Sequence, residues 1–387
     1  MRVVYNSFEG AFSDSPRVIF EALARGRSRD EHVWLADPRL QSTFPASVAT
    51  VEYGSAESVA ALEAADVVIA NTHTDVPWSK RPETLYVQTW HGTPLKRIHW
   101  DVLWAPPGRL ERLQEDVDRW DLLLSPNRVA TPLLRRAFRY EGEVLEIGYP
   151  RNDILSAPDR ESVRTRVRRR LGIPAERTVV LYAPTWRDDQ VFVEGGKPFA
   201  LGMDLDVFTR ALGEDHVLLL RLHYMVSTPL AAELHPAIRD VSRHPDVSEL
   251  YLAADVLVTD YSSVMFDFAI TGKPIVLFAY DLEDYQDRLR GFYLELADEA
   301  PGPLVATTEE VVAALRERPG ADDRYRERYA RFRDRFSDLE DGRVTERFLE
   351  HLLPAVRARG ASASDGGGRV DAGNPSPSEP DAVPARP

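Results

Sequence analysis

The 387-residue chain contains no cysteine. Disulfide bonds, thiolate metal sites and cysteine nucleophiles are therefore excluded. The chain also lacks an apolar run long enough to span a bilayer, and residues 1–5 do not form the apolar segment of a signal peptide. We therefore expect a cytoplasmic protein that is soluble or peripheral to a membrane.

Positive charge is also scarce, and several well-known motifs are missing. Lys and Arg number 48 against 62 Asp and Glu, a net charge of −14, which argues against generic nucleic-acid binding. The sequence has no P-loop, GxGxxG fingerprint, GxSxG elbow, HExxH motif or clustered histidines. We therefore predict no metal site and no cofactor, and expect phosphate charge to be met by Arg, Lys, His and helix N-termini.

Short β-branched or leucine-rich runs alternate with longer helical patterns, which is typical of α/β proteins with parallel sheets. The predicted strands are 48–53, 67–71, 84–88, 122–125 and 144–147 in the first half, and 178–183, 216–222, 255–259, 274–278 and 304–306 in the second. Two stacked α/β halves explain this pattern most simply.

The turn at 148–153 interrupts the periodicity with Gly and Pro and marks the predicted domain boundary. The expected domains are residues 1–150 and residues 151–354, the second ending in helical patterns at 325–336 and 342–353. Residues 355–387 are rich in Gly, Ser, Pro, Asp and Ala and are expected to be a disordered tail.

The segment 90–96, Trp-His-Gly-Thr-Pro-Leu-Lys, follows a predicted strand and places His91 and Lys96 at a predicted strand-to-helix corner. Gly92 permits close approach of a ligand to the backbone, and Pro94 suits a first helical turn whose free N–H groups face an anion. An ordinary strand-helix junction with a buried Trp is the alternative interpretation.

A second segment, 255–267, indicates a strand, a tight turn and a helix. Ser262 or Ser263 is predicted to cap that helix, whose N-terminus would form a phosphate cradle at the end of a parallel strand. Asp267, one turn further, would accept a ribose or polyol hydroxyl. Plain capping, with Asp267 as a first-turn acid favoured by the helix dipole, is the alternative.

Two more predicted strands end in residues suited to phosphate. Pro184 and Thr185 follow one strand, and Arg221 and His223 share one face at the end of the next. Arg151, after the domain boundary, would supply a further planar cation. The alternatives are a paired Arg, a satisfied strand-end His and a surface Arg at a hinge.

Two surface features suggest contact with an anionic membrane or a lipid-linked acceptor. A predicted helix carries six arginines, and three apolar residues follow the 90–96 segment. The residues are Arg160, Arg164, Arg166, Arg168, Arg169 and Arg170, with Trp100, Leu103 and Trp104. A solvated basic helix and core tryptophans form the alternative.

Taken together and in order, these motifs resemble the CDP-glycerol glycerophosphotransferase family, which primes or polymerises teichoic acid chains. The matching segments are 14–17, 90–96, 148–153, 183–187, 221–223, 260–267 and 341–343. The resemblance implies a GT-B-like α/β fold, with two Rossmann-like domains facing a central cleft and the donor bound by the C-terminal half.

The resemblance also implies roles for individual residues. His91 would be the catalytic base, and Arg221 and His223 would assist by neutralising phosphate charge. The implied donor contacts are Gly92, Thr93, Pro94, Leu95, Arg151, Pro184, Thr185, Arg221, His223, Ser262, Ser263 and Asp267. Since the chain begins directly with the catalytic unit, the resemblance does not decide between a primase and a polymerase.

The predicted reaction is attack of an acceptor hydroxyl on CDP-glycerol, or on a related CDP-polyol such as CDP-ribitol, with release of CMP. The expected acceptor is a lipid-linked saccharide or polyol phosphate, which would place the protein at the inner face of the cell membrane. A nucleotide-sugar glycosyltransferase and a non-catalytic phospholigand-binding protein remain as alternatives.

Overall fold

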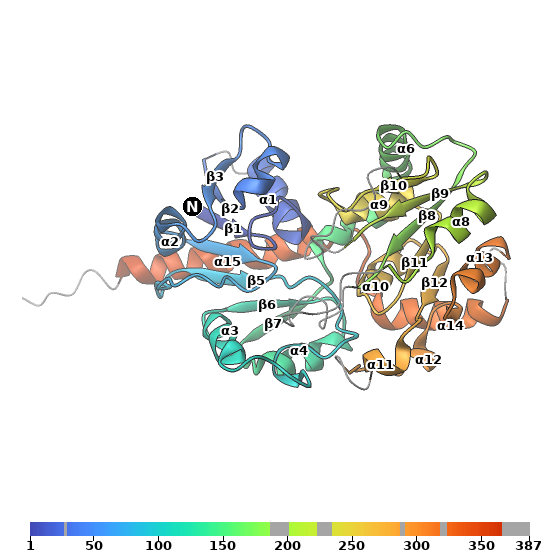
Figure 1. Ribbon diagram of the computed structural model, residues 1–387. Coiled ribbons are helices and arrows are strands. Elements are labelled where there is room, and N and C mark those ends of the chain that lie inside the picture. Colours follow the sequence, from blue (N-terminus) through green and yellow to red (C-terminus); the bar gives the residue numbers. More distant parts are fainter. Residues whose placement is uncertain (27–28, 186–200, 223–233, 287–290, 318–322, 366–387) are drawn as a thin grey trace, which may run out of the picture.

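A computed structural model describes residues 1–26, 29–185, 201–222, 234–286, 291–317 and 323–365. Two parallel β-sheets, each flanked by helices, form two α/β domains that lie side by side (Figure 1). The predicted fold class, two Rossmann-like domains with helices at the C-terminus, is therefore confirmed.

Within the described residues, the first sheet has seven parallel strands in the order β3-β2-β1-β4-β5-β6-β7. They are β1 (Arg2–Asn6), β2 (Glu31–Ala36), β3 (Ala49–Glu52), β4 (Val67–Ala70), β5 (Leu85–Gln88), β6 (Leu122–Ser125) and β7 (Glu143–Glu146). Five match predicted strands. The sequence analysis missed β1 and β2, because each begins with polar residues that shorten its apolar run.

The second sheet, in the same described part of the chain, has six parallel strands in the order β10-β9-β8-β11-β12-β13. They are β8 (Thr178–Ala183), β9 (His216–Leu220), β10 (Ile238–Asp240), β11 (Val256–Thr259), β12 (Ile275–Phe278) and β13 (Leu304–Val305). Only β10 was not predicted, since it is a three-residue edge strand containing Arg and Asp. The central strands are buried on both faces, which explains their continuous apolar sequences.

Helices cover the two faces of each sheet (Figure 1). In the first domain they are α1 (Asp14–Gly26), α2 (Ala56–Glu63), α3 (Arg109–Val117) and α4 (Ala130–Phe138). The 3-10 turn η3 (Pro150–Asn152) and α5 (Asp153–Ser156) lead into the second domain. There follow α6 (Arg160–Arg170), α8 (Leu205–Leu212), α9 (Val247–Ala253), α10 (Val264–Ala269), α11 (Leu282–Asp284), α12 (Leu296–Glu299), α13 (Thr308–Arg316) and α14 (Asp323–Phe336).

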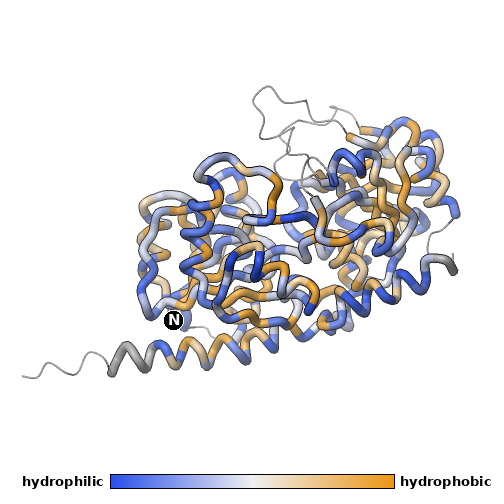
Figure 2. The backbone as a smooth tube through the Cα atoms, turned by 90° about the horizontal axis from the view of Figure 1, so that it is seen from below, coloured by the Kyte–Doolittle hydropathy of each residue, from blue (hydrophilic) through white to orange (hydrophobic). Residues whose placement is uncertain are grey.

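The last helix, α15 (Val344–Asp365), returns to the first domain and runs beneath its sheet (Figure 1). Phe348 and Leu352 are fully buried in the same apolar cluster as Val3 and Tyr5 of β1. Hydrophobic and hydrophilic residues are interspersed along the helix (Figure 2), as expected for a helix with one buried face. The C-terminal end of the expected second domain therefore packs against the first domain.

The prediction of disorder from residue 355 is wrong for residues 355–365, which continue α15. Their polar composition resembles a tail, but the docked helix is already nucleated, so extending it fixes few residues per hydrogen bond. The remaining residues of the predicted tail, 366–387, lie outside the described residues. Among the described helices, none combines the length and hydropathy that crossing a bilayer requires.

Candidate active site

The two domains touch at the ends of their parallel strands. The loop after β5 carries Gly92, and the loop after β11 leads to Ser263 at the start of α10. A Cβ atom placed on Gly92 would lie 2.6 Å from the Oγ and 2.9 Å from the Cβ of Ser263. The first and second predicted motifs therefore meet across the domain interface.

His91 sits beside this contact with one ring nitrogen already engaged. Its Nδ1 lies 2.5 Å from the main-chain oxygen of Asn71, which follows β4. A carbonyl oxygen only accepts, so Nδ1 carries the hydrogen and Nε2 keeps its lone pair in the neutral ring. Phe8 and Trp90 flank the imidazole, with ring centroids at 5.3 and 4.1 Å. This tautomer is the one that a general base at Nε2 requires.

The backbone before His91 adopts an uncommon conformation. Trp90 has φ of 55°, in the left-handed region that bulky residues rarely adopt. Its amide donates to the side-chain oxygen of Gln88 (2.9 Å), and Thr89 Oγ1 donates to its carbonyl (3.1 Å). These bonds hold the strained turn that aims the imidazole, which is the kind of place where strain accompanies function.

Burial lowers the pKa of His91 to about 4, although the Asn71 carbonyl and the carboxylate of Asp14 oppose this effect. Arg151 and His73 lower it further. The pKa lies below the usual value for histidine because rings and backbone enclose the imidazole. The ring is consequently neutral at physiological pH and able to take a proton.

The rest of the 90–96 segment packs against the second domain. The prediction that a helix begins there is wrong. Leu95 is 2 % exposed and packs in the apolar core of the second domain. Its carbonyl accepts from the amide of Tyr293 (2.8 Å), and Lys96 forms a β-bridge with Phe292. Strand-like pairing with another segment replaces the helical turn that Pro94 seemed to begin.

Thr93 is also committed to the protein interior. It is 3 % exposed, and its Oγ1 accepts a hydrogen bond from Asn127 Nδ2 at 3.2 Å. The same amide group donates to the carbonyl of Phe336 in α14 at 3.0 Å. Of the residues in this segment, Gly92 therefore lies next to Ser263, whereas Thr93 and Leu95 anchor the loop.

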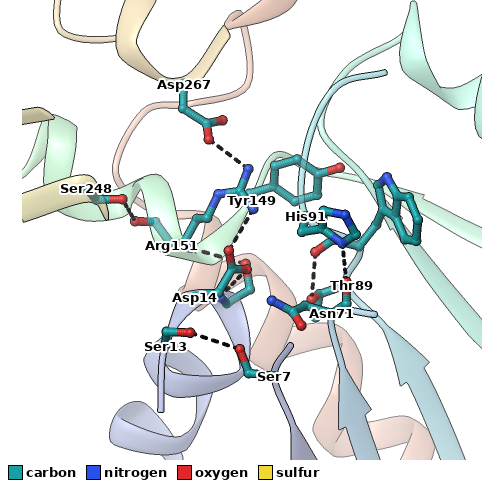
Figure 3. A network of polar contacts seen from close by, with 12 residues as sticks. Ser7, Ser13, Asp14, Asn71, Thr89, His91, Tyr149, Arg151, Ser248 and Asp267 are labelled. Atoms are coloured by element: carbon teal, nitrogen blue, oxygen red, sulfur yellow. Dashed lines mark hydrogen bonds and ion pairs between the residues drawn. The ribbon is translucent and has the colours of Figure 1, made fainter. Parts of the chain in front are cut away.

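Arg151 occupies the centre of a buried ion cluster between the domains (Figure 3). Its Nη1 donates to Asp14 of α1 at 2.9 Å, and its Nη2 donates to Asp267 of α10 at 2.7 Å. The guanidinium stacks over Tyr149, 4.6 Å from the ring centroid. Burial alone would lower the pKa of Arg151, but the two carboxylates outweigh burial and raise it. Arg151 and Asp267, each predicted separately as a donor contact, are thus in direct contact with each other.

This cluster extends to a carboxyl group that the sequence analysis did not single out. Asn152 Nδ2 donates to Asp267 Oδ1 at 3.1 Å and to Glu340 Oε1 at 3.2 Å. Burial raises the pKa of Glu340 to about 8, while the Tyr149 amide and Asn152 oppose this shift. Asp14 and Glu340 were missed as individual sites, although both lie in or beside segments that carry the family resemblance.

Arg221 follows β9 in the second domain and has a different environment. Its Nη1 donates to the main-chain oxygens of Val241 (3.2 Å) and His244 (2.8 Å). Among the described residues no carboxylate forms a salt bridge with it, and burial lowers its pKa. A desolvated guanidinium held by neutral carbonyls is well prepared to receive an anion.

The other predicted donor contacts lie at the ends of β8 and β11. Thr185, just after Pro184, donates its amide to Asp260 Oδ1 at 2.8 Å, which joins the two strand ends. Ser263 occupies the N-cap position of α10 but makes no side-chain capping bond, and Ser262 Oγ accepts from the Val264 amide at 3.4 Å. His223 lies outside the described residues.

No group of three or more His, Cys, Asp or Glu side chains within the described ranges is arranged to hold a metal ion. Ionisable groups near the domain contact include His91, Arg151 and its two carboxylate partners. Arg221 stands at the carboxyl end of the second sheet. The arrangement provides a neutral imidazole and an arginine that pairs with no carboxylate in the described part of the chain, which suits charge neutralisation and proton transfer at a phosphoryl group.

Comparison with known proteins gives consistent matches over nearly the whole chain. The family model of CDP-Glycerol:Poly(glycerophosphate) glycerophosphotransferases matches residues 1–353. A teichoic acid glycerol-phosphate transferase of Staphylococcus aureus is 37% identical over 362 residues, covering 91% of this chain and 92% of the relative. A teichoic acid poly(glycerol phosphate) polymerase of Staphylococcus epidermidis is 38% identical over 355 residues, 89% of this chain. The present chain spans about half of that polymerase, 49% of its length.

Among solved structures, a histidine-to-asparagine variant of the wall teichoic acid polymerase TagF, soaked with CDPG, aligns with a TM-score of 0.84. It is 36% identical, and the alignment covers 92% of this chain and 90% of that chain. A UDP-GlcNAc 2-epimerase of Methanocaldococcus jannaschii aligns at 13% identity with a TM-score of 0.51, which shows the fold alone. On these matches, the chain belongs to the CDP-glycerol:poly(glycerophosphate) glycerophosphotransferase family.

Proposed function

We propose that this protein transfers glycerol phosphate from CDP-glycerol to a hydroxyl group of a teichoic acid acceptor and releases CMP. The observation that carries the proposal is the placement of His91. Asn71 fixes its tautomer so that Nε2 is the basic atom, and the adjacent Gly92 touches the start of α10 in the second domain. Family membership and the structural match to TagF support the choice of donor.

In the proposed reaction, the acceptor oxygen attacks the β-phosphorus of CDP-glycerol while Nε2 of His91 takes the hydroxyl proton. The new bond joins the acceptor oxygen to phosphorus, and the broken bond is the one between the β-phosphorus and the bridging oxygen, which leaves with CMP. For phosphoryl transfer, the protein mainly has to align the reactants and neutralise charge. Arg221 and His223, with the amides at Ser262 and Ser263, would supply this for the donor.

We also propose that the acceptor is lipid-linked and that Leu103 and Trp104 contact the membrane surface. Leu103 is 47% exposed and Trp104 is 67% exposed, so this part of the surface presents two large apolar side chains to solvent. Tryptophan favours the membrane–water interface. The basic helix α6 offers weaker support, because Arg164 and Arg168 form ion pairs with Asp255.

The transferase is tested by following both products from CDP-glycerol that carries a labelled β-phosphate. With an acceptor that mimics the lipid-linked disaccharide, the label should enter the acceptor and CMP should appear in equal amount. Replacing CDP-glycerol with CDP-ribitol tests the choice of polyol. His91→Ala should abolish CMP release while leaving CDP-glycerol binding largely intact, and retained turnover in that variant contradicts the role of His91 as the base.

The same experiment separates the two alternatives. A nucleotide-sugar glycosyltransferase would leave the nucleoside diphosphate intact and transfer a sugar. A non-catalytic protein would bind CDP-glycerol and release no CMP at any acceptor concentration. Either result would replace the proposed reaction.

A further inference from the structure

Asp14 is held in one orientation by bonds from two directions. It is the first residue of α1, with φ of 61° in the left-handed region, and its Oδ1 accepts from the Ser15 amide at 2.7 Å. Its Oδ2 accepts from Arg151 at 2.9 Å, and only 7% of the side chain is exposed. A carboxylate fixed in this way acts on its surroundings as a stationary negative charge.

The imidazole of His91 lies within the field of that charge. Figure 3 shows Asp14 between Arg151 and Asn71, the residue whose carbonyl contacts His91. The charged groups that act on the ring are Asp14, Arg151 and His73, and of these Asp14 alone favours the protonated ring. The Asn71 carbonyl favours it too, through its bond to Nδ1.

A base buried among aromatic rings needs such a partner. When Nε2 takes a proton, the ring becomes a cation in surroundings that penalise charge, and Arg151 adds repulsion. A carboxylate that already stands in place stabilises this cation without reorganising. Arg151 pairs with Asp14 on the first-domain side and with Asp267 on the second-domain side.

On the basis of the proposed function, we infer that Asp14 is a positioning residue for His91. Through space it stabilises the imidazolium that forms when Nε2 receives the acceptor proton. Through Arg151 it ties the first domain to Asp267 of α10, at the start of which Ser263 meets Gly92. Asp14 thus acts both on the charge of His91 and, through Arg151, on the contact between the two domains.

Asp14→Asn tests this inference, because Asn has nearly the same volume and also tolerates the left-handed region. The matched control is Asp255→Asn, which removes a carboxylate that pairs with Arg164 and Arg168 far along the second domain. Titration of ¹⁵N-histidine-labelled full chain, with His91 assigned by His91→Gln, reports the protonation midpoint of the imidazole. The kcat and KM for CMP release are measured on the same samples.

We expect the His91 midpoint to move to lower pH in Asp14→Asn and kcat to fall about tenfold or more, with no rise in KM for CDP-glycerol. Asp255→Asn should leave the midpoint and kcat unchanged. Asp14→Glu, which keeps the charge, should restore part of the midpoint shift. An unchanged midpoint in Asp14→Asn, or an equal shift in the control, overturns the inference. Since the titration needs no turnover, failure of the wild type to use CDP-glycerol would refute the proposed function separately.

Discussion

Gly92 of the first domain and Ser263 of the second lie so close that no side chain fits between them. A Cβ on Gly92 would come within 2.6 Å of Ser263 Oγ. The loop that carries His91 therefore packs against the start of α10, and the position of His91 depends on the fit between the two domains.

Gly92→Ala should separate the domains locally and reduce activity. The added methyl group clashes with Ser263, which cannot move far because it leads directly into α10. We expect kcat for CMP release to fall about tenfold or more, since small displacements at a reacting centre are costly. Gly26→Ala, where no atom lies within 4 Å of the added carbon, is the control. Ser263→Gly combined with Gly92→Ala should recover part of the activity, and an active single variant would contradict the steric argument.

Arg221→Gln should weaken donor binding with little effect on folding. The guanidinium now bonds main-chain oxygens of Val241 and His244 and has an anion-binding role in the proposed reaction. Loss of a charge-assisted bond to phosphate predicts a rise in KM for CDP-glycerol of about tenfold. Arg177→Gln serves as the control, because Arg177 likewise donates to a main-chain oxygen, that of Gly213. An unchanged KM in Arg221→Gln would exclude a phosphate contact.

Arg151→Met should destabilise the protein strongly. It leaves the carboxylates of Asp14 and Asp267 buried without their shared cation, and such a loss costs about 3–5 kcal/mol of unfolding free energy. Arg39→Met removes the pair with Asp37, but Arg39 is 88% exposed, so a much smaller loss of unfolding free energy is expected. Urea denaturation measures both. Equal losses of unfolding free energy in the two variants would show that burial of the cluster does not increase the cost of removing its arginine.

Glu340→Gln should change how stability depends on pH. The pKa of Glu340 is raised from its usual 4.5 to about 8 by burial, so between these values the unfolded chain loses the proton and the folded chain keeps it. Stability is therefore fully present below 4.5 and falls as pH rises toward 8. Gln keeps an acceptor for the Tyr149 amide and Asn152 but cannot ionise.

We therefore expect Glu340→Gln to melt at a higher temperature than the wild type at about pH 8, by about 2 °C or more, and at a similar temperature at about pH 5. Thermal denaturation followed by circular dichroism at both pH values measures the difference. Glu346→Gln, a substitution on exposed helix surface of the same region, should show no such pH dependence. Parallel melting curves for Glu340→Gln and wild type at both pH values would contradict the assignment.

The strands and the functional motifs could be predicted from the sequence because they depend on local features. Continuous apolar runs such as 67–70 and 256–259 are buried on both faces in the structure, as their composition requires. The family resemblance implied that loops of both domains face one cleft, and Gly92 after β5 does meet Ser263 after β11. Parallel strands end at the same edge within each sheet, so position along the chain indicated which loops gather at that edge of each domain.

The partners of the site residues could not be predicted from the sequence. Nothing local indicates that Leu95 enters the core of the second domain, that Arg151 bonds Asp14 and Asp267, or that Glu340 reaches Asn152. Each contact joins residues more than a hundred positions apart, or crosses from one domain to the other. The low pKa of His91 has the same origin, because it depends on which groups enclose the ring.

Sequence by itself determined the α/β class, most of the strands and the candidate loops at their ends, because apolar runs and turn residues act over a few neighbouring positions. Tertiary structure alone decided the tautomer and charge state of His91, the ion cluster at Arg151 and the return of α15 to the first domain. Those features arise from burial and from contacts between distant segments. Such contacts exist only once both domains have folded and met.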